Sequence, residues 1–136
     1  MVDLYEFSLG PFARGFHVVT DDVVRHLGRL PEIGVLNLFI KHTSAAICIN
    51  ENYDPDVLDD FSTFYDRLVP EYFPGMKHTT EGPDDMPAHI KSVFTGTSLM
   101  VPISDHKLCL GTWQGIYLCE FRNNARARDL VATIIT

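Results

Sequence analysis

Two short apolar segments separated by four polar residues limit the possible folds more than any other feature of this sequence. Residues 35–40 run directly into a lysine and His42, and residues 45–49 run directly into the polar triplet 50–52. Apolar segments of this length, rich in branched side chains, are typical of β-strands. Polar side chains at strand ends are either the solvated tips of paired strands or parts of a site, so both interpretations are kept for His42 and Glu51.

Strand-like patterns recur along the rest of the chain. Residues 2–9 alternate between apolar and polar side chains and are followed by Gly10-Pro11, which predicts a first strand and a turn. Residues 16–20 are the expected hairpin partner of this strand. A second hairpin is expected around the Gly-Thr-Trp-Gln-Gly sequence of residues 111–115. The later predicted strands are residues 97–103, 107–110, 116–121 and 128–135.

The most clearly defined helix begins at Asp54-Pro55. A carboxylate at the N-cap accepts hydrogen bonds from free backbone amides, and proline is favoured at the first helical position. The apolar side chains that follow recur at helical spacing, and we expect them to form a buried stripe. They are Val57, Leu58, Phe61, Phe64, Tyr65, Leu68 and Val69. Shorter helices are predicted after Asp21-Asp22 and over residues 86–94.

Six to eight strands and two or three short helices in 136 residues predict an α+β fold. We expect one compact domain over residues 1–136, in which a mainly antiparallel sheet forms a β-sandwich or partial barrel. Hydrophobic residues make up 46% of the chain, which is enough to bury a core at this length.

Charge and cysteine content narrow the possible partners and the compartment. The net charge is −7 and no block of lysine and arginine occurs, which argues against binding to nucleic acid or to an anionic membrane. The first ten residues lack the pattern of a signal peptide, and no apolar run approaches the length of a membrane span. Three cysteines without a Cys-x-x-Cys pair, each among apolar neighbours, predict a reduced, cytoplasmic location.

Three histidines lie where predicted elements begin or end, namely His42, His78 and His89. The N-terminus of a helix disfavours imidazolium, so His89 is expected to be neutral and free to bind a metal or a proton. Three imidazoles with one open position are a common catalytic metal site. Their spacing matches no compact ligand motif, so a metal-free alternative remains, in which one histidine is a general acid or base and Glu51 or Asp84 orients it.

A tight turn and several basic residues are the other candidate ligand contacts. Trp113 and Gln114 lie between two glycines, which suits a close approach to a ligand, an interface between subunits or a plain hairpin turn. The basic side chains either bind phosphate or are solvated charges at strand ends. They are Lys91, Arg122, Arg126 and Arg128. No Walker or Gly-x-Gly-x-x-Gly phosphate loop is present.

Three longer sequence motifs contain most of these candidate residues. They are Lys-His-Thr-Ser-Ala-Ala at 41–46 with Asn-Glu-Asn at 50–52, Glu-Gly-Pro-Asp-Asp-Met-Pro-Ala-His-Ile-Lys-Ser at 81–92, and Gly-Thr-Trp-Gln-Gly-Ile at 111–116. Together they resemble the YjbQ-like family, called secondary thiamine-phosphate synthases, over nearly the whole chain. The resemblance implies a compact β-rich homotrimer with His42, His78 and His89 in one pocket compatible with zinc, magnesium or manganese.

The same resemblance implies an activity that joins a hydroxymethylpyrimidine pyrophosphate to a thiazole phosphate. We expect Asn50, Glu51 and Asp84 to position water or substrate beside the metal. Contacts to a small phosphorylated substrate are expected from Ser44, Lys91, Thr112, Trp113, Gln114 and Arg122. The alternative function is a non-catalytic module that binds a metal or a phosphorylated metabolite, its true role being unknown.

Overall fold

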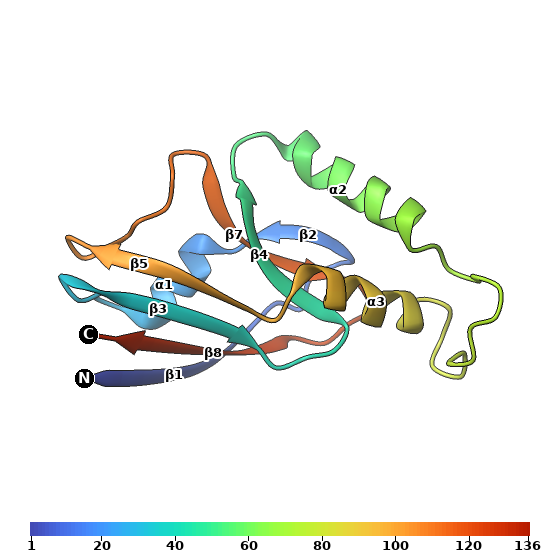
Figure 1. Cartoon of the computed structure of the whole chain (residues 1–136), viewed down its shortest axis with the longest axis horizontal. Coiled ribbons are helices and arrows are strands. Elements are labelled where there is room, and N and C mark those ends of the chain that lie inside the picture. The colour runs from blue at the N-terminus through green and yellow to red at the C-terminus, as the bar shows by residue number, and fades with distance from the viewer.

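The computed structural model describes residues 1–136, which form eight strands and three helices (Figure 1). The elements are β1 (Val2–Leu9), β2 (Gly15–Val18), α1 (Thr20–Leu27), β3 (Ile33–Ile40), β4 (Ala45–Glu51), α2 (Pro55–Leu68), α3 (Asp85–Thr95), β5 (Ser98–Ser104), β6 (Lys107–Leu108), β7 (Gln114–Glu120) and β8 (Arg128–Ile135). Two antiparallel sheets, ordered β1-β8-β3-β5-β6 and β2-β7-β4, form a half-barrel. The predicted α+β fold is therefore confirmed.

The main core lies between the two sheets and includes α1. Alternate side chains of β8 point into it, namely Leu130, Ala132 and Ile134, as the period of two requires. Ile116 and Leu118 of β7 enter the same core from the other sheet.

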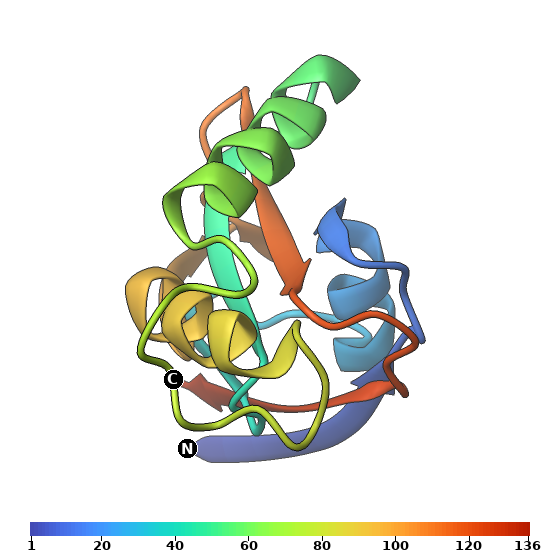
Figure 2. The same ribbon diagram turned by 90° about the vertical axis from the view of Figure 1, so that its right-hand side faces the viewer.

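A second core lies on the opposite face of the three-stranded sheet. Tyr117 and Cys119 of β7 point into it, and α2 and α3 lie over this face (Figure 2). β7 is therefore buried on both faces, which explains why its sequence reads as a nearly continuous apolar run instead of an alternating one.

Both predicted hairpins are wrong, because the strands pair with distant partners. β1 pairs with β8, whereas β2 pairs with β7 in the other sheet. β6 pairs with β5, and β7 pairs with β4 and β2. β3 and β4, which flank the polar residues 41–44, also belong to different sheets. Turn residues mark where a strand stops, but burial of the inner faces of both sheets decides which strands become neighbours.

α2 begins as predicted but is less buried than its apolar stripe suggests. The side chain of Asp54 accepts a hydrogen bond from the backbone N–H of Asp56 at 2.9 Å. No residue of α2 is fully buried, and Phe64 and Leu68 remain 62% and 55% exposed. The helix rests on a sheet of only three strands, so part of its wide stripe finds no partner. None of the helices combines the length and apolar character needed to span a membrane.

Candidate functional site

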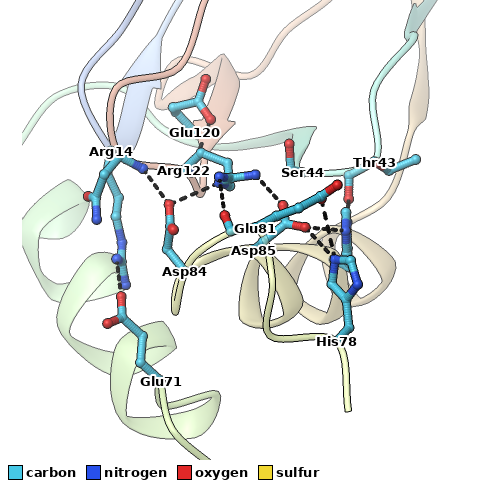
Figure 3. Close-up of polar contacts among 12 residues, drawn as sticks. Arg14, Thr43, Ser44, Glu71, His78, Glu81, Asp84, Asp85, Glu120 and Arg122 are labelled. Atoms are coloured by element: carbon cyan, nitrogen blue, oxygen red, sulfur yellow. Dashed lines mark hydrogen bonds and ion pairs between the residues drawn. The ribbon is translucent and has the colours of Figure 1, made fainter. Parts of the chain in front are cut away.

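Three side chains converge at the N-terminal end of α3. Asp85 begins this helix, and His89 lies one turn later on the same face. His78 reaches them from the loop between α2 and α3 (Figure 3). The Nε2 atoms of His78 and His89 lie 2.6 and 3.1 Å from Oδ2 of Asp85. The three ligand atoms lie within 4.8 Å of one another, as they would around a metal ion.

Arg122, which follows β7, holds the carboxylates at the start of α3. Its Nη1 donates to Oδ1 of Asp85, the oxygen that does not face the histidines. Its Nε donates to Oδ2 of Asp84 at 2.9 Å, and its Nη2 donates to the carbonyl oxygen of Glu81 at 3.0 Å (Figure 3). One planar guanidinium therefore fixes the orientation of Asp85 while leaving Oδ2 directed at His78 and His89.

The backbone of residue 43 sets the tautomer of His89. Nδ1 of His89 lies 2.8 Å from the carbonyl oxygen of Thr43, which can only accept a hydrogen bond. Nδ1 must therefore carry the proton, and in the neutral ring the Nε2 lone pair points toward Asp85 and His78. This is the arrangement found around metal-binding histidines, in which the second ring nitrogen is tied to a carbonyl or carboxylate.

Hydrogen bonds and opposite charges within the cluster shift the pKa values of Asp85 and His78. Burial of Asp85 opposes its ionisation, but the hydrogen bond with His78 and the charges of His89 and Arg122 prevail and lower the pKa of Asp85 to about 2. The same hydrogen bond to Asp85 raises the pKa of His78 above its ordinary value. Asp85 is therefore ionised across the physiological range, as a metal ligand must be.

His42 lies outside this group of three. Its Nε2 accepts the backbone N–H of Asp129 at 2.8 Å, and its Nδ1 lies 3.3 Å from Nη1 of Arg128. Burial and the charge of Arg128 lower the pKa of His42, which favours the neutral ring. His42 nevertheless shares one hollow of about 450 Å³ with His89, lined in addition by Thr43, Ser92, Val93 and Thr97.

Several other predicted site residues lie at the far end of the three-stranded sheet. β4 begins near the Thr43 anchor of His89 and ends at Glu51, and its register pairs Glu51 with Gln114. Seven strand residues span about 20 Å, so Asn50, Glu51 and the turn with Thr112 and Trp113 are remote from the cluster within one chain. Trp113 is 59% exposed and packs against Tyr53 with ring centroids 5.3 Å apart.

The remaining predicted contacts are engaged in the fold. Lys91 is 1% exposed, and its Nζ donates to Oδ1 of Asp66 on α2 at 2.7 Å. Ser44 is buried, and its carbonyl oxygen accepts the backbone N–H of Phe121 at 3.3 Å. The carboxylate of Asp84 accepts from Arg122 and, at 2.8 Å, from the backbone N–H of Asn123.

Asp85 was not among the ligands predicted from the sequence. The spacing of Asp85 and His89, four residues apart at the start of a predicted helix, places both side chains on one face and was the available signal. The roles of Arg122 as a clamp on Asp85 and of the Thr43 carbonyl depend on how distant strands end beside α3.

An apolar hollow of about 310 Å³ adjoins His78 on the side of the α2–α3 loop. Its wall is formed mainly by aromatic, methionine and proline side chains. These are Tyr72, Phe73, Met76, Pro83, Met86 and Pro87. A polar cluster beside an apolar hollow is the usual composition of a small-molecule site.

Comparisons with known proteins agree on one family. A family model described as UPF0047 protein YjbQ-like matches residues 6–136. The chain is 44% identical over 129 residues to the UPF0047 protein YjbQ of Escherichia coli O157:H7, covering 93% of each chain. It is 43% identical to a UPF0047 protein of Synechocystis sp., covering 92% of this chain and 84% of that protein.

Solved structures show the same fold. An uncharacterised conserved protein of the yjbq/upf0047 family from Clostridium acetobutylicum matches with a TM-score of 0.80 and 37% identity, over 96% of this chain and 98% of that chain. A YbjQ-like protein of unknown function from Sulfolobus solfataricus P2 matches with a TM-score of 0.85 over 99% and 97% of the two chains. At 24% identity this second likeness concerns the fold alone.

Proposed function

This chain belongs to the YjbQ-like UPF0047 family, and from this premise we propose that it binds a divalent metal ion through His78, Asp85 and His89. We propose further that the ion holds the phosphate of a small molecule. The observation that carries the proposal is the convergence of two imidazole nitrogens and one carboxylate oxygen within 4.8 Å. Two histidines and one carboxylate form a common catalytic metal site that leaves positions open for water or substrate.

The choice of metal follows from the ligand types. Imidazole suits zinc and other transition metals, whereas magnesium prefers oxygen ligands and retains its water. Two of the three ligands are imidazoles, so zinc or manganese is favoured over magnesium. Glu81, whose Oε2 lies 3.5 Å from Nε2 of His78, is placed to add a further oxygen ligand.

The surroundings support a ligand with a charged part and a flat apolar part. We expect phosphate oxygens to bind the metal, because three of the five N–H donors of Arg122 are already directed at Asp84, Asp85 and the Glu81 carbonyl oxygen. The apolar hollow beside His78 suits a heteroaromatic ring. On the other side, Thr97 lines the hollow shared by His42 and His89, as does Ser92, whose hydroxyl donates to the carbonyl oxygen of Ala88 at 2.8 Å.

The reaction implied by the family resemblance is compatible with such a ligand. Joining a pyrimidine pyrophosphate to a thiazole phosphate requires a cation that stabilises the departing pyrophosphate and a pocket that aligns the two rings. A bound metal would supply that charge, and the two hollows that flank His89 and His78 would hold the ring systems. The alternative is a module that binds the same class of ligand without turnover.

Metal binding is tested first by titrating the chelator-treated, untagged protein with Zn²⁺ and Mn²⁺ in a calorimeter. We expect one site per chain, with affinity reduced by at least about tenfold in Asp85→Asn and in His89→Ala. His26→Asn, which changes an exposed histidine of α1, is the matched control and should bind as the wild type does. Equal affinity in all four proteins would reject the site.

Turnover is tested separately with the metal-loaded protein. Incubation with the pyrimidine pyrophosphate and the thiazole phosphate, followed by mass spectrometry for thiamine phosphate, distinguishes an enzyme from a binding module. Product that disappears in Asp85→Asn supports the synthase reaction. A metal-dependent thermal shift with both compounds but no product supports the binding module.

A further inference from the structure

Two cysteines lie side by side beneath α2, away from the proposed metal ligands. Cys48 is on β4 and Cys119 on β7, and their Sγ atoms are 3.7 Å apart. The register pairs Ala46 with Cys119 and Cys48 with Tyr117, so the two cysteines are diagonal neighbours on one face of the sheet. Both are free thiols.

One thiol is accessible and the other is not. Cys119 is buried among aromatic side chains that include Phe16 and Phe121, whereas Cys48 is half-buried at the edge of the same cluster. Leu58 and Phe61 of α2, a helix without a single fully buried residue, pack against the same cluster as Cys48. Of these two cysteines, Cys48 is therefore the one that a small reagent reaches first.

The environment also separates the two thiols chemically. The hydrogen bond from the Cys119 thiol lowers the pKa of Cys48. Burial raises the pKa of Cys119 well above its ordinary value. Cys48 is therefore the better thiolate and the group that attacks the hydroperoxide, and Cys119 keeps its proton until it attacks the oxidised Cys48 sulfur.

We propose that Cys48 and Cys119 form a redox couple that reduces a hydroperoxide and closes to a disulfide between β4 and β7. The Cys48 thiolate attacks the terminal oxygen of the hydroperoxide, which becomes the oxygen of a sulfenic acid while the alcohol or water leaves with a proton. The Cys119 sulfur then attacks the Cys48 sulfur, and the sulfenic oxygen leaves as water. Two thiols and one hydroperoxide thus give one disulfide, one alcohol or water and one further water.

The second step requires only a local movement. The sulfur atoms must approach from 3.7 Å to about 2 Å, the length of a disulfide bond. Cys48 is half-buried and can rotate toward β7, but diagonal neighbours lie about 7–8 Å apart, so β4 and β7 must also draw closer at this point. A diagonal cross-strand bond is strained compared with a structural disulfide, so a dithiol reductant should reopen it readily.

The experiment uses the full chain, reduced, freed of reductant and exposed to hydrogen peroxide. The reaction is stopped with acid, and the free thiols are alkylated in denaturant so that buried groups also react. We expect the intact mass to show the loss of two hydrogens, with only one of the three cysteines alkylated. Peptide mapping should join Cys48 to Cys119, and dithiothreitol should restore three reactive thiols.

Conservative variants separate the two roles. Cys119→Ser should stop at a sulfenic acid on Cys48 that a dimedone probe traps, and Cys48→Ser should form no intrachain disulfide. Cys109→Ser, which removes the exposed third cysteine, is the control and should oxidise as the wild type does. The proposal fails if Cys48 and Cys119 stay alkylatable after peroxide, or if Cys109 alone is oxidised. None of these outcomes depends on metal binding.

Discussion

Asp85 is the residue on which the proposed metal site depends. Its Oδ2 is directed at His78 and His89, and its Oδ1 is held by Arg122. The carboxylate thus joins an exposed loop, the start of a helix and the end of a strand. A change at Arg122 should therefore act on the metal site without removing any proposed ligand.

Replacing Arg122 by glutamine tests this role. The neutral amide cannot clamp Asp84 and Asp85 together, so Asp85 should lose its fixed orientation. We expect the affinity for Zn²⁺ to fall by about 10–100-fold in a calorimetric titration. Arg25→Gln, which removes an exposed arginine paired only with Asp22, is the control and should leave the affinity unchanged. An Arg122→Gln protein with wild-type affinity would contradict the clamp.

Metal binding should also depend on pH through His78. The hydrogen bond to Asp85 raises the pKa of His78 above about 6.5, so the ring keeps its proton to a higher pH than an ordinary histidine. A metal needs the lone pair that this proton occupies. The affinity for the metal should therefore have its full value above the raised pKa of His78 and should fall as the pH drops through that pKa. Titrations at about pH 6 and about pH 8 should differ in that direction, with proton release on binding. Affinity that is flat over this range would show that His78 is not a ligand.

At the scale of elements, a buried ion pair connects the two sheets. Glu120 ends β7 and is fully buried, and Nε of Arg128 at the start of β8 donates to its Oε1 at 2.6 Å. Arg128→Met would remove the only cation from this buried carboxylate and leave it the backbone N–H of Arg122, 3.2 Å from Oε2, which costs about 3–5 kcal/mol of unfolding free energy. Adding Glu120→Gln should recover part of that loss. Urea denaturation measures both, and a double variant less stable than Arg128→Met would contradict the argument.

Local patterns predicted the elements well but not their partners. The limits of the first and last strands, residues 2–9 and 128–135, agree with β1 and β8, because alternation and turn residues are local signals. The first predicted hairpin failed because β1 pairs with β8 at the other end of the chain, and the second failed because β6 pairs with β5 whereas β7 pairs with β2 and β4. Nothing near residues 2–9 encodes that choice, which depends on how both sheets bury their inner faces.

The candidate site was likewise predicted only in part by local patterns. His78 and His89 were recognised from their positions at element boundaries, and Asp85 was readable from its helical spacing to His89. His42 does not join His78 and His89, because its ring accepts the backbone N–H of Asp129. This contact depends on where β8 begins beside His42, and no local sequence pattern predicts it. Glu51 was predicted beside the histidines from sequence proximity to His42, but an extended strand carries it to the other end of the sheet.

At the scale of the whole molecule, one sheet face is uncovered. The outward side of the five-stranded sheet exposes apolar side chains on β1, β3 and β5, among them Leu4, Phe39 and Met100. Apolar surface of this kind is typical of subunit interfaces. We expect the homotrimer implied by the family resemblance to use this face.

Sedimentation equilibrium tests the assembly. The wild type should sediment as a trimer at micromolar concentration, and Phe39→Asp should shift it toward monomer because a charge would be buried in the interface. Phe64→Asp, which places the same charge on an exposed aromatic position of α2, should remain trimeric. A monomeric wild type would contradict the trimer, and a trimeric Phe39→Asp would assign the interface to another face.

Because α2 is only partly buried, we expect it to unfold locally while the rest of the molecule stays folded. Amide protons of β7, which is bonded to a strand on each side and covered on both faces, should exchange with deuterated water only through global unfolding. Those of α2, a helix in which no residue is fully buried, should exchange through a smaller fluctuation that leaves both sheets intact. Lifting of α2 alone would uncover the second core, so this face of the protein would be intermittently open to solvent while the rest of the fold persists.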